Sequence, residues 1–171
     1  SMLQPTRLFD LLQFQLENTP GINIFSSNIN GDWIGISTAD FMKRVDEIAK
    51  GLIAAGIQKD EKVALISENR LEWNLLDFAI QQVGAVVVAI YTNISDNDYQ
   101  FILNNAEVKL CFVSNEKLYR RLNVVQSSIS SMTTLLSLDK IEGIPHWQEL
   151  IEKGNDISND VLKQRKEAVE T

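Results

Sequence analysis

The stretch KVALISENRLEWNLLDFAI, residues 62–80, begins as an apolar strand and ends as an amphipathic helix. A polar hinge joins the two parts and consists of Ser67, Glu68, Asn69 and Arg70. Open α/β sheets usually bind ligands beside such turns, at the carboxyl ends of buried strands. The same position also calls for polar residues that cap the following helix. The stretch therefore predicts a strand-to-helix turn and, beside it, a candidate cleft.

Short apolar strands alternate with amphipathic helices after this stretch. Strands are predicted at residues 63–66, 85–90, 110–113 and 134–138. Apolar residues recur at helical spacing in the helix capped by Ser95 and in the next one. They are Tyr99, Ile102, Leu103 and Ala106, followed by Leu118, Leu122, Val125 and Ile129. This alternation is typical of a parallel sheet, so we expect a three-layer α/β fold flanked by helices.

The residues before Lys62 follow another pattern. Leucines at helical spacing between residues 8 and 16 predict an N-terminal helix. Asn30 and Gly31 separate two β-rich segments, which predicts a hairpin with strands at 22–26 and 33–36. Ser37 or Thr38 then caps a helix that stops at Gly56.

Three regions follow from these patterns. Residues 1–61 should form a helix, a hairpin and a helix, and residues 62–140 the parallel α/β core. Residues 141–171 should form a helical tail.

Composition excludes several functions. A net charge of −7 argues against a nucleic-acid surface, which needs clustered Lys and Arg. Cys111 and His146 are the only residues of their types, so one chain cannot build a multi-Cys/His metal site or an internal disulfide. We expect Cys111 in the core and His146 at the start of a surface helix. The longest apolar run, residues 85–91, is far short of the ~20 residues of a membrane span.

Chemical motifs are absent. The glycines fit neither G-x-G-x-x-G nor the G-x-x-x-x-G-K-[ST] phosphate loop. No catalytic residue, cofactor-binding residue or metal ligand is therefore assigned.

Four residues remain as cleft candidates. Ser67 and Glu68 follow one strand, and Tyr91 and Thr92 follow the next along the chain. Asn69 in the hinge and Glu72 in the helix that follows have the spacing of a capping box, and they are expected to have structural roles. Gly56 and Gly84 are likewise expected to end helices.

The order of these blocks resembles the amino-terminal part of the AMP-binding, adenylate-forming enzymes, and most of all the long-chain fatty acid–CoA ligases. The resemblance lies in ISTADFMKRVDEIAKGL (36–52), GIQKDEKVALISENRLEWNLLDFAIQQVGAVVVAIYTNIS (56–95) and ILNNAEVKLCFVS (102–114). It covers residues 8–114 well. The chain departs from the family at Leu71 and Thr92, where proline is common.

The resemblance implies a longer enzyme whose large amino-terminal domain begins with this chain. That parent would use ATP and Mg²⁺ to convert a fatty carboxylate into an acyl-adenylate, releasing pyrophosphate, and would then transfer the acyl group to CoA. The phosphate loop, the nucleotide-binding segments and the catalytic lysine of the family would lie downstream of Thr171. This chain alone is therefore expected to be inactive and to bind none of these cofactors.

The resemblance also implies partners and a location. The partners are fatty acid, CoA and the remaining segments of the parent chain, and the isolated chain should self-associate through surface that those segments cover. A cytoplasmic protein is expected, and peripheral membrane association of the parent stays open. The alternatives are a free-standing flavodoxin-like or receiver-like binding module and a non-catalytic scaffold domain. Acyl chain length and the identity of the acyl acceptor stay open as well.

Overall fold

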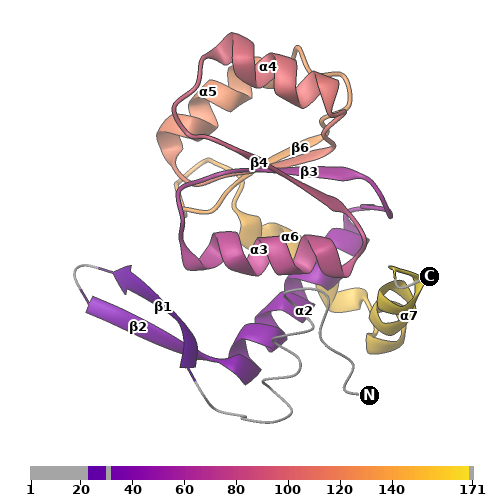
Figure 1. Cartoon of the computed structure of the whole chain (residues 1–171). Coiled ribbons are helices and arrows are strands. Elements are labelled where there is room, and N and C mark those ends of the chain that lie inside the picture. The colour runs from indigo at the N-terminus through magenta and orange to yellow at the C-terminus, as the bar shows by residue number, and fades with distance from the viewer. Residues whose placement is uncertain (1–22, 30–31, 170–171) are drawn as a thin grey trace, which may run out of the picture.

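A parallel sheet forms the centre of the computed structural model, which describes residues 23–29 and 32–169 (Figure 1). The strands are β3 (Lys62–Ile66), β4 (Val86–Ile90), β5 (Leu110–Val113) and β6 (Thr134–Ser137). Their order across the sheet is β4-β3-β5-β6, and every neighbouring pair is parallel. The predicted α/β sheet is thereby confirmed.

Helices cover both faces of the sheet (Figure 1). They are α2 (Thr38–Ala54), α3 (Leu71–Gln82), α4 (Asp96–Asn105), α5 (Glu116–Gln126), α6 (Trp147–Lys153) and α7 (Asn159–Val169), with a short 3₁₀ turn, η1 (Gly154–Asp156). In Figure 1, α4 and α5 lie above the sheet, and α2, α3 and α6 lie below it. The predicted three layers are therefore present.

The hairpin is also present. Strands β1 (Asn23–Ile29) and β2 (Asp32–Ser37) pair antiparallel as a sheet of their own. The predicted turn residues Asn30 and Gly31 and the predicted helix near residues 8–16 lie outside the described residues.

The predicted helix ends agree with the structure at four places. The Ser37 hydroxyl accepts a hydrogen bond from the Asp40 amide at 3.1 Å, and the Ser95 hydroxyl accepts one from the Asp98 amide at 3.1 Å. Gly56 follows α2 with φ +84°, and Gly84 follows α3 with φ +80°. Glycine adopts this left-handed conformation without a steric penalty, which explains why the helices stop there.

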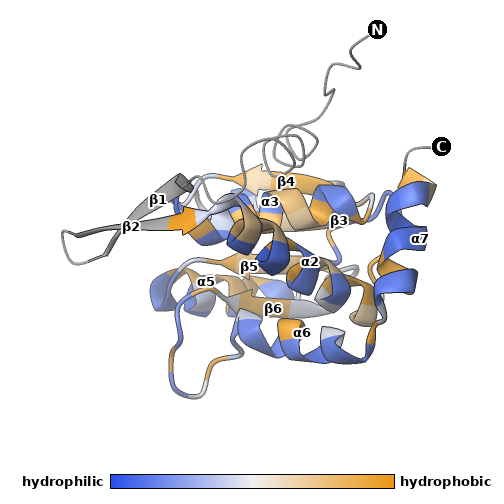
Figure 2. Cartoon of the chain, turned by 90° about the horizontal axis from the view of Figure 1, so that it is seen from below, coloured by the Kyte–Doolittle hydropathy of each residue, from blue (hydrophilic) through white to orange (hydrophobic). Residues whose placement is uncertain are grey.

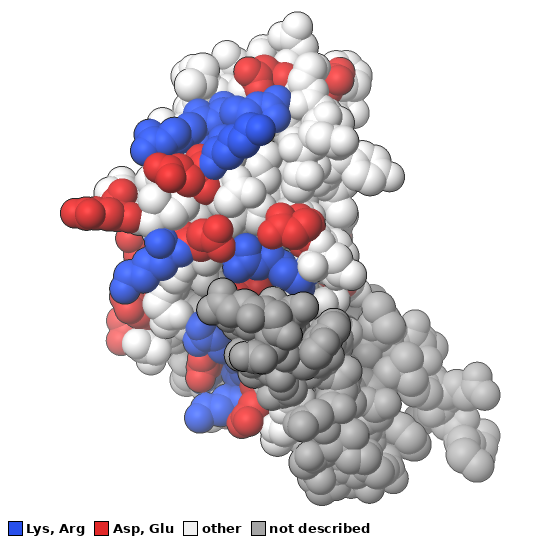
Figure 3. All heavy atoms as spheres, turned by 90° about the vertical axis from the view of Figure 1, so that its left-hand side faces the viewer, with Lys and Arg blue, Asp and Glu red and all other residues white. Residues whose placement is uncertain are grey.

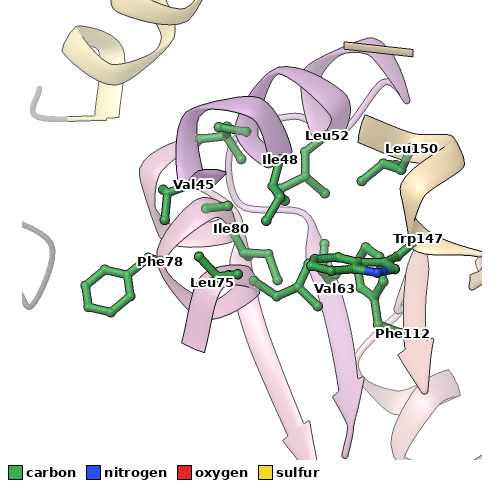
Figure 4. Packing of buried hydrophobic residues seen from close by; sticks show 14 of the residues in the cluster. Val45, Ile48, Leu52, Val63, Leu75, Phe78, Ile80, Phe112, Trp147 and Leu150 are labelled. Carbon is green, nitrogen blue, oxygen red and sulfur yellow. The ribbon is translucent and has the colours of Figure 1, made fainter. Parts of the chain in front are cut away.

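Two apolar clusters fill the space between the layers. The first packs α2, α3 and α6 against one face of the sheet (Figure 4) and includes the Phe41 and Phe78 rings, which meet edge to face at 5.4 Å. The second packs α4 and α5 against the other face and contains Cys111. Burial raises the pKa of the Cys111 thiol, so this side chain is the core residue that the sequence predicted.

Helices α2 and α6 approach each other at two glycines. A Cβ atom on Gly51 would lie 2.5 Å from the Leu150 carbonyl oxygen. A Cβ atom on Gly154 would lie 2.5 Å from the Gly51 backbone nitrogen. Only glycine leaves enough room for the two backbones at this contact.

Helix α7 is held mainly by polar contacts, and Figure 2 shows it as mostly hydrophilic. Leu162 is its buried residue. The Arg165 guanidinium donates to the carbonyl oxygens of Ile57 at 2.8 Å and Val83 at 3.2 Å. Lys166 pairs with Asp46 on α2 at 3.0 Å. The charged tail that the sequence predicted thus forms a helix that bridges the ends of α2 and α3.

Candidate functional site

The carboxyl ends of the strands meet on one side of the sheet, at the left in Figure 1. The chain leaves β3 toward β4 in one direction, and it leaves β5 toward β6 in the other. In doubly wound sheets, this reversal leaves a crevice at the carboxyl edge, where ligands bind. The sequence candidates lie beside this edge.

A groove of about 610 Å³ lies at the ends of β3 and β4. Its lining residues are Ser67, Glu68, Asn69, Trp73, Ala89, Ile90, Tyr91 and Thr92. All four cleft candidates from the sequence therefore line one cavity. Its volume falls in the range of small-molecule sites, which are typically about 300–1,000 Å³.

The groove combines aromatic and polar walls. Trp73 packs against the first apolar cluster, whereas Tyr91 is 81% exposed. The Ser67 hydroxyl donates to the Glu68 carbonyl oxygen at 2.8 Å. Across the groove, the buried Tyr99 donates its hydroxyl proton to the Tyr91 carbonyl oxygen at 2.8 Å, which fixes the backbone there. Such walls suit a ligand with one flat apolar part and one polar part.

A second cavity of about 310 Å³ continues the groove toward α5. The two cavities share Glu68 and Thr92. Arg121 lines the second cavity, where it pairs with Asp96 at 2.9 Å and donates to the Ile94 carbonyl oxygen at 2.6 Å. Figure 3 faces this side of the molecule and shows Lys and Arg side chains next to Asp and Glu. Charge here is paired across the surface.

Arg70 connects the ends of three strands, a role that the sequence analysis missed. Its Nε donates to Glu72 at 2.8 Å, and its other contacts are with Asp139 beyond β6 at 2.9 Å and the Ser114 carbonyl oxygen beyond β5 at 3.4 Å. Glu68 lies 3.6 Å away. Burial would lower the pKa of Arg70, but its carboxylate partners outweigh burial and raise it. Likewise, burial would raise the pKa of Glu72, but Arg70 lowers it.

The expected capping box at Asn69 and Glu72 is wrong. Arg70 occupies the N-cap position of α3, and no side chain makes the cap hydrogen bond. Glu72 turns to the Arg70 guanidinium instead of reaching back along the chain. The Glu72 carboxylate pairs with a full positive charge at Arg70 instead of with the partial charge of a backbone N–H.

His146 has a structural position. Its Nδ1 accepts the Gln148 amide at 3.3 Å, as the cap of α6, and its Nε2 lies 3.0 Å from the Leu138 carbonyl oxygen. Both ring nitrogens are thus engaged with the backbone.

The described residues lack two further features. Residues 23–29 and 32–169 hold no group of three or more His, Cys, Asp and Glu side chains that could bind a metal ion. In the same part of the chain, no helix has both the length and the apolar character needed to cross a bilayer.

Comparison with known proteins gives a family match. The model of the family described as AMP-binding enzyme matches residues 12–170. The long-chain-fatty-acid–CoA ligase FadD15 of Mycobacterium tuberculosis is 29% identical over 119 residues, which are 70% of this chain and 20% of that protein. The long-chain-fatty-acid–CoA ligase ACSBG2 of Xenopus laevis is 24% identical over 168 residues, which are 95% of this chain and 23% of that protein. The chain thus spans about a fifth of the length of these relatives.

Solved structures share the fold. A fatty acyl CoA synthetase of Mycobacterium tuberculosis superposes with a TM-score of 0.68 at 18% identity, covering 83% of this chain and 27% of that one. The A-PCP didomain of carboxylic acid reductase from Segniliparus rugosus, solved with AMP, gives a TM-score of 0.70 at 17% identity and covers 96% of this chain and 25% of that one.

Proposed function

The chain belongs to the AMP-binding enzyme family, and from this premise we propose that it is the front part of an ATP-dependent long-chain fatty acid–CoA ligase. The observation that carries the proposal is the family match over residues 12–170, together with relatives of that name, of which the matched residues cover 20% and 23%. The parent would form an acyl-adenylate and then a CoA thioester. It would be a cytoplasmic enzyme, able to associate peripherally with membranes.

An activity assay of the protein that the complete reading frame encodes tests this proposal. The parent protein should release pyrophosphate from ATP in the presence of a long-chain fatty acid and Mg²⁺, and should form acyl-CoA when CoA is added. The sheet order found here also occurs in flavodoxin-like modules. A free-standing binding module or a scaffold domain would release no pyrophosphate with any fatty acid.

We propose that the triphosphate of ATP binds to segments of the parent other than the described residues. Phosphates bind at helix N-termini through free backbone N–H groups and a positive local field. The helices that begin at the carboxyl edge carry carboxylates in the first turn: Glu72 in α3, Asp96 and Asp98 in α4, and Glu116 in α5. These charges oppose a triphosphate, so we assign nucleotide binding to other segments of the parent.

The isolated chain should therefore not bind ATP and Mg²⁺ with micromolar affinity. The physical reason is the negative charge of the carboxylates in the first turns of α3, α4 and α5, which opposes a triphosphate. Titration calorimetry with ATP and Mg²⁺ measures this directly, with the parent protein as the positive control. Saturable micromolar binding by the isolated chain would refute the assignment.

We propose that the groove contacts a substrate of the parent through Ser67, Glu68, Tyr91 and Thr92. Their common cavity at the carboxyl edge supports this role. In the parent, Tyr91→Ala should raise the KM of one substrate by about tenfold, because an exposed aromatic wall is lost. The matched control is Phe101→Ala, which removes an aromatic ring that is 69% exposed on α4, outside the groove. Equal KM values for the two variants would contradict a role of the groove.

We further expect the isolated chain to self-associate. Strand β4 lies at the edge of the sheet, and its Val86 is 42% exposed. An exposed apolar edge strand is a template for pairing with another chain. Sedimentation equilibrium should show dimers or larger species that Val86→Lys weakens, because an edge lysine opposes pairing. Val124→Lys, at a position on α5 that is 73% exposed, is the matched control. A monomer at every concentration would exclude self-association.

A further inference from the structure

An arginine occupies the position where α3 needs a cap. Asn, Asp, Ser and Thr are the residues that cap helices well, and Arg70 makes no side-chain cap hydrogen bond. Its side chain is 24% exposed and contacts Glu72 close by in sequence as well as Ser114 and Asp139, which are distant in sequence. A guanidinium has no acceptor atom and cannot cap a helix start, so the contribution of Arg70 lies in the contacts that its side chain donates.

The hinge itself has few anchors of its own. The Ser67 hydroxyl bonds to the adjacent Glu68 carbonyl, and the Glu68 carboxylate lies near Arg70. Asn69 has no hydrogen-bond partner in the part of the chain that the structure describes. These three residues form one wall of the groove. The position of that wall therefore depends on what holds the hinge at Arg70.

Arg70 holds the hinge to two other strands. Its Nη1 donates to the Asp139 carboxylate beyond β6 at 2.9 Å and to the Ser114 carbonyl oxygen beyond β5 at 3.4 Å. Its Nε reaches Glu72 in α3 at 2.8 Å. The rigid guanidinium plane fixes the angle between these contacts, which the single ammonium group of lysine cannot do.

We propose that Arg70 is a positioning residue for the groove: it fixes residues 67–69 against β5 and β6, so that this wall is preset before a substrate binds. The proposal rests on the proposed function, because the substrate is one of those of the parent ligase. A preset wall costs less conformational entropy on binding than a mobile loop. Arg70 does not line the groove, so it acts through its neighbours.

The test uses the full-length parent with Arg70→Met, Arg70→Lys and Asp139→Asn. The parent has three substrates, which are ATP, fatty acid and CoA. Arg70→Met should raise the KM of one of them by about 10-fold to 100-fold, while the KM values of the other two substrates and the kcat change by less than about twofold. Arg70→Lys should recover only part of this loss, because it keeps the charge and loses the fixed geometry. Asp139→Asn should raise the same KM, and the double variant should show less than the product of the two single effects.

Arg44→Met is the matched control. Arg44 is also partly buried and paired, with Glu47 at 3.0 Å and Gln148 at 2.8 Å, but it lies between α2 and α6, away from the groove. If Arg70→Met lowers kcat for all substrates and leaves every KM unchanged, Arg70 is only structural and the proposal is wrong. The same KM change in Arg44→Met would also overturn it.

Hydrogen exchange separates this proposal from the proposed function. In the same full-length protein, Arg70→Met should speed amide exchange at Ser114 and Asp139 at least about tenfold, with little change in α5. These two amides donate to the Ile66 and Ser114 carbonyl oxygens, which join the ends of β3, β5 and β6 where Arg70 holds them. This result would support the positioning role even if the parent has no ligase activity. Unchanged exchange at Ser114 and Asp139 would overturn the role, whether or not the parent is a ligase.

Discussion

Replacing Phe112 with alanine is expected to lower the free energy of unfolding by about 3 to 5 kcal/mol. Phe112 lies on β5 in the middle of the sheet, and its side chain is fully buried in the first apolar cluster. Figure 4 shows its ring beside Trp147 of α6. The substitution removes a large apolar side chain and leaves a cavity between rigid layers, which cannot collapse to fill it.

Urea denaturation of the isolated chain measures this loss, provided that the m-value is unchanged. The matched control is Cys111→Ala, because Cys111 is the adjacent residue and is equally buried but faces the second cluster. Cys111→Ala removes a single sulfur atom, so we expect it to lower the free energy of unfolding by only about 1 kcal/mol. A loss below about 1.5 kcal/mol for Phe112→Ala would mean that the layers repack more freely than this structure implies.

Gly51→Ala is expected to destabilise the fold by about 2 to 3 kcal/mol, although alanine is the better helix former. In an exposed helix interior, the same change would stabilise by about 1 kcal/mol. The sign reverses here because the new Cβ would lie 2.5 Å from the Leu150 carbonyl oxygen. That atom belongs to the backbone of α6, so relief requires a shift of the whole helix.

Thermal denaturation checks the sign of this change. Lys43→Ala, at an exposed position on the same helix, controls for propensity and should change stability by less than about 0.5 kcal/mol. Gly154→Ala should reproduce the loss from the other side of the contact, because its Cβ would meet the Gly51 backbone. A neutral or stabilising Gly51→Ala would show that α2 and α6 separate easily.

Local signals explain why the sheet and the cleft could be predicted from the sequence. The strand at Leu110–Val113 is a continuous apolar run, and the structure places the strand at the same residues. The alternation of strands and helices predicted parallel strands, and parallel strands bring their carboxyl ends to one edge of the sheet. The cleft residues directly follow two of these strands and are Ser67, Glu68, Tyr91 and Thr92. In both cases, the pattern of residues adjacent in sequence was enough to predict the structural feature.

Long-range contacts explain what could not be predicted. The partners of Arg70 at Ser114 and Asp139 are 44 and 69 residues away, so no spacing rule reveals them. The Asn69 and Glu72 pattern predicted a cap from local spacing, and a long-range ion network displaced it. The close approach of α2 and α6 at Gly51 depends on how two separate helices pack. A single glycine within a helix does not indicate which segment it contacts.

Few buried apolar contacts attach α7 to the rest of the fold. Burying one leucine contributes about 1.5–3 kcal/mol, and partly exposed ion pairs such as Lys166–Asp46 contribute about 0–1 kcal/mol each. The sum is small beside the many buried side chains that hold α2 and α3 to the sheet. The Arg165 hydrogen bonds to Ile57 and Val83 add to this attachment. We expect α7 to detach before the sheet unfolds, and salt to favour detachment by screening the Lys166–Asp46 pair.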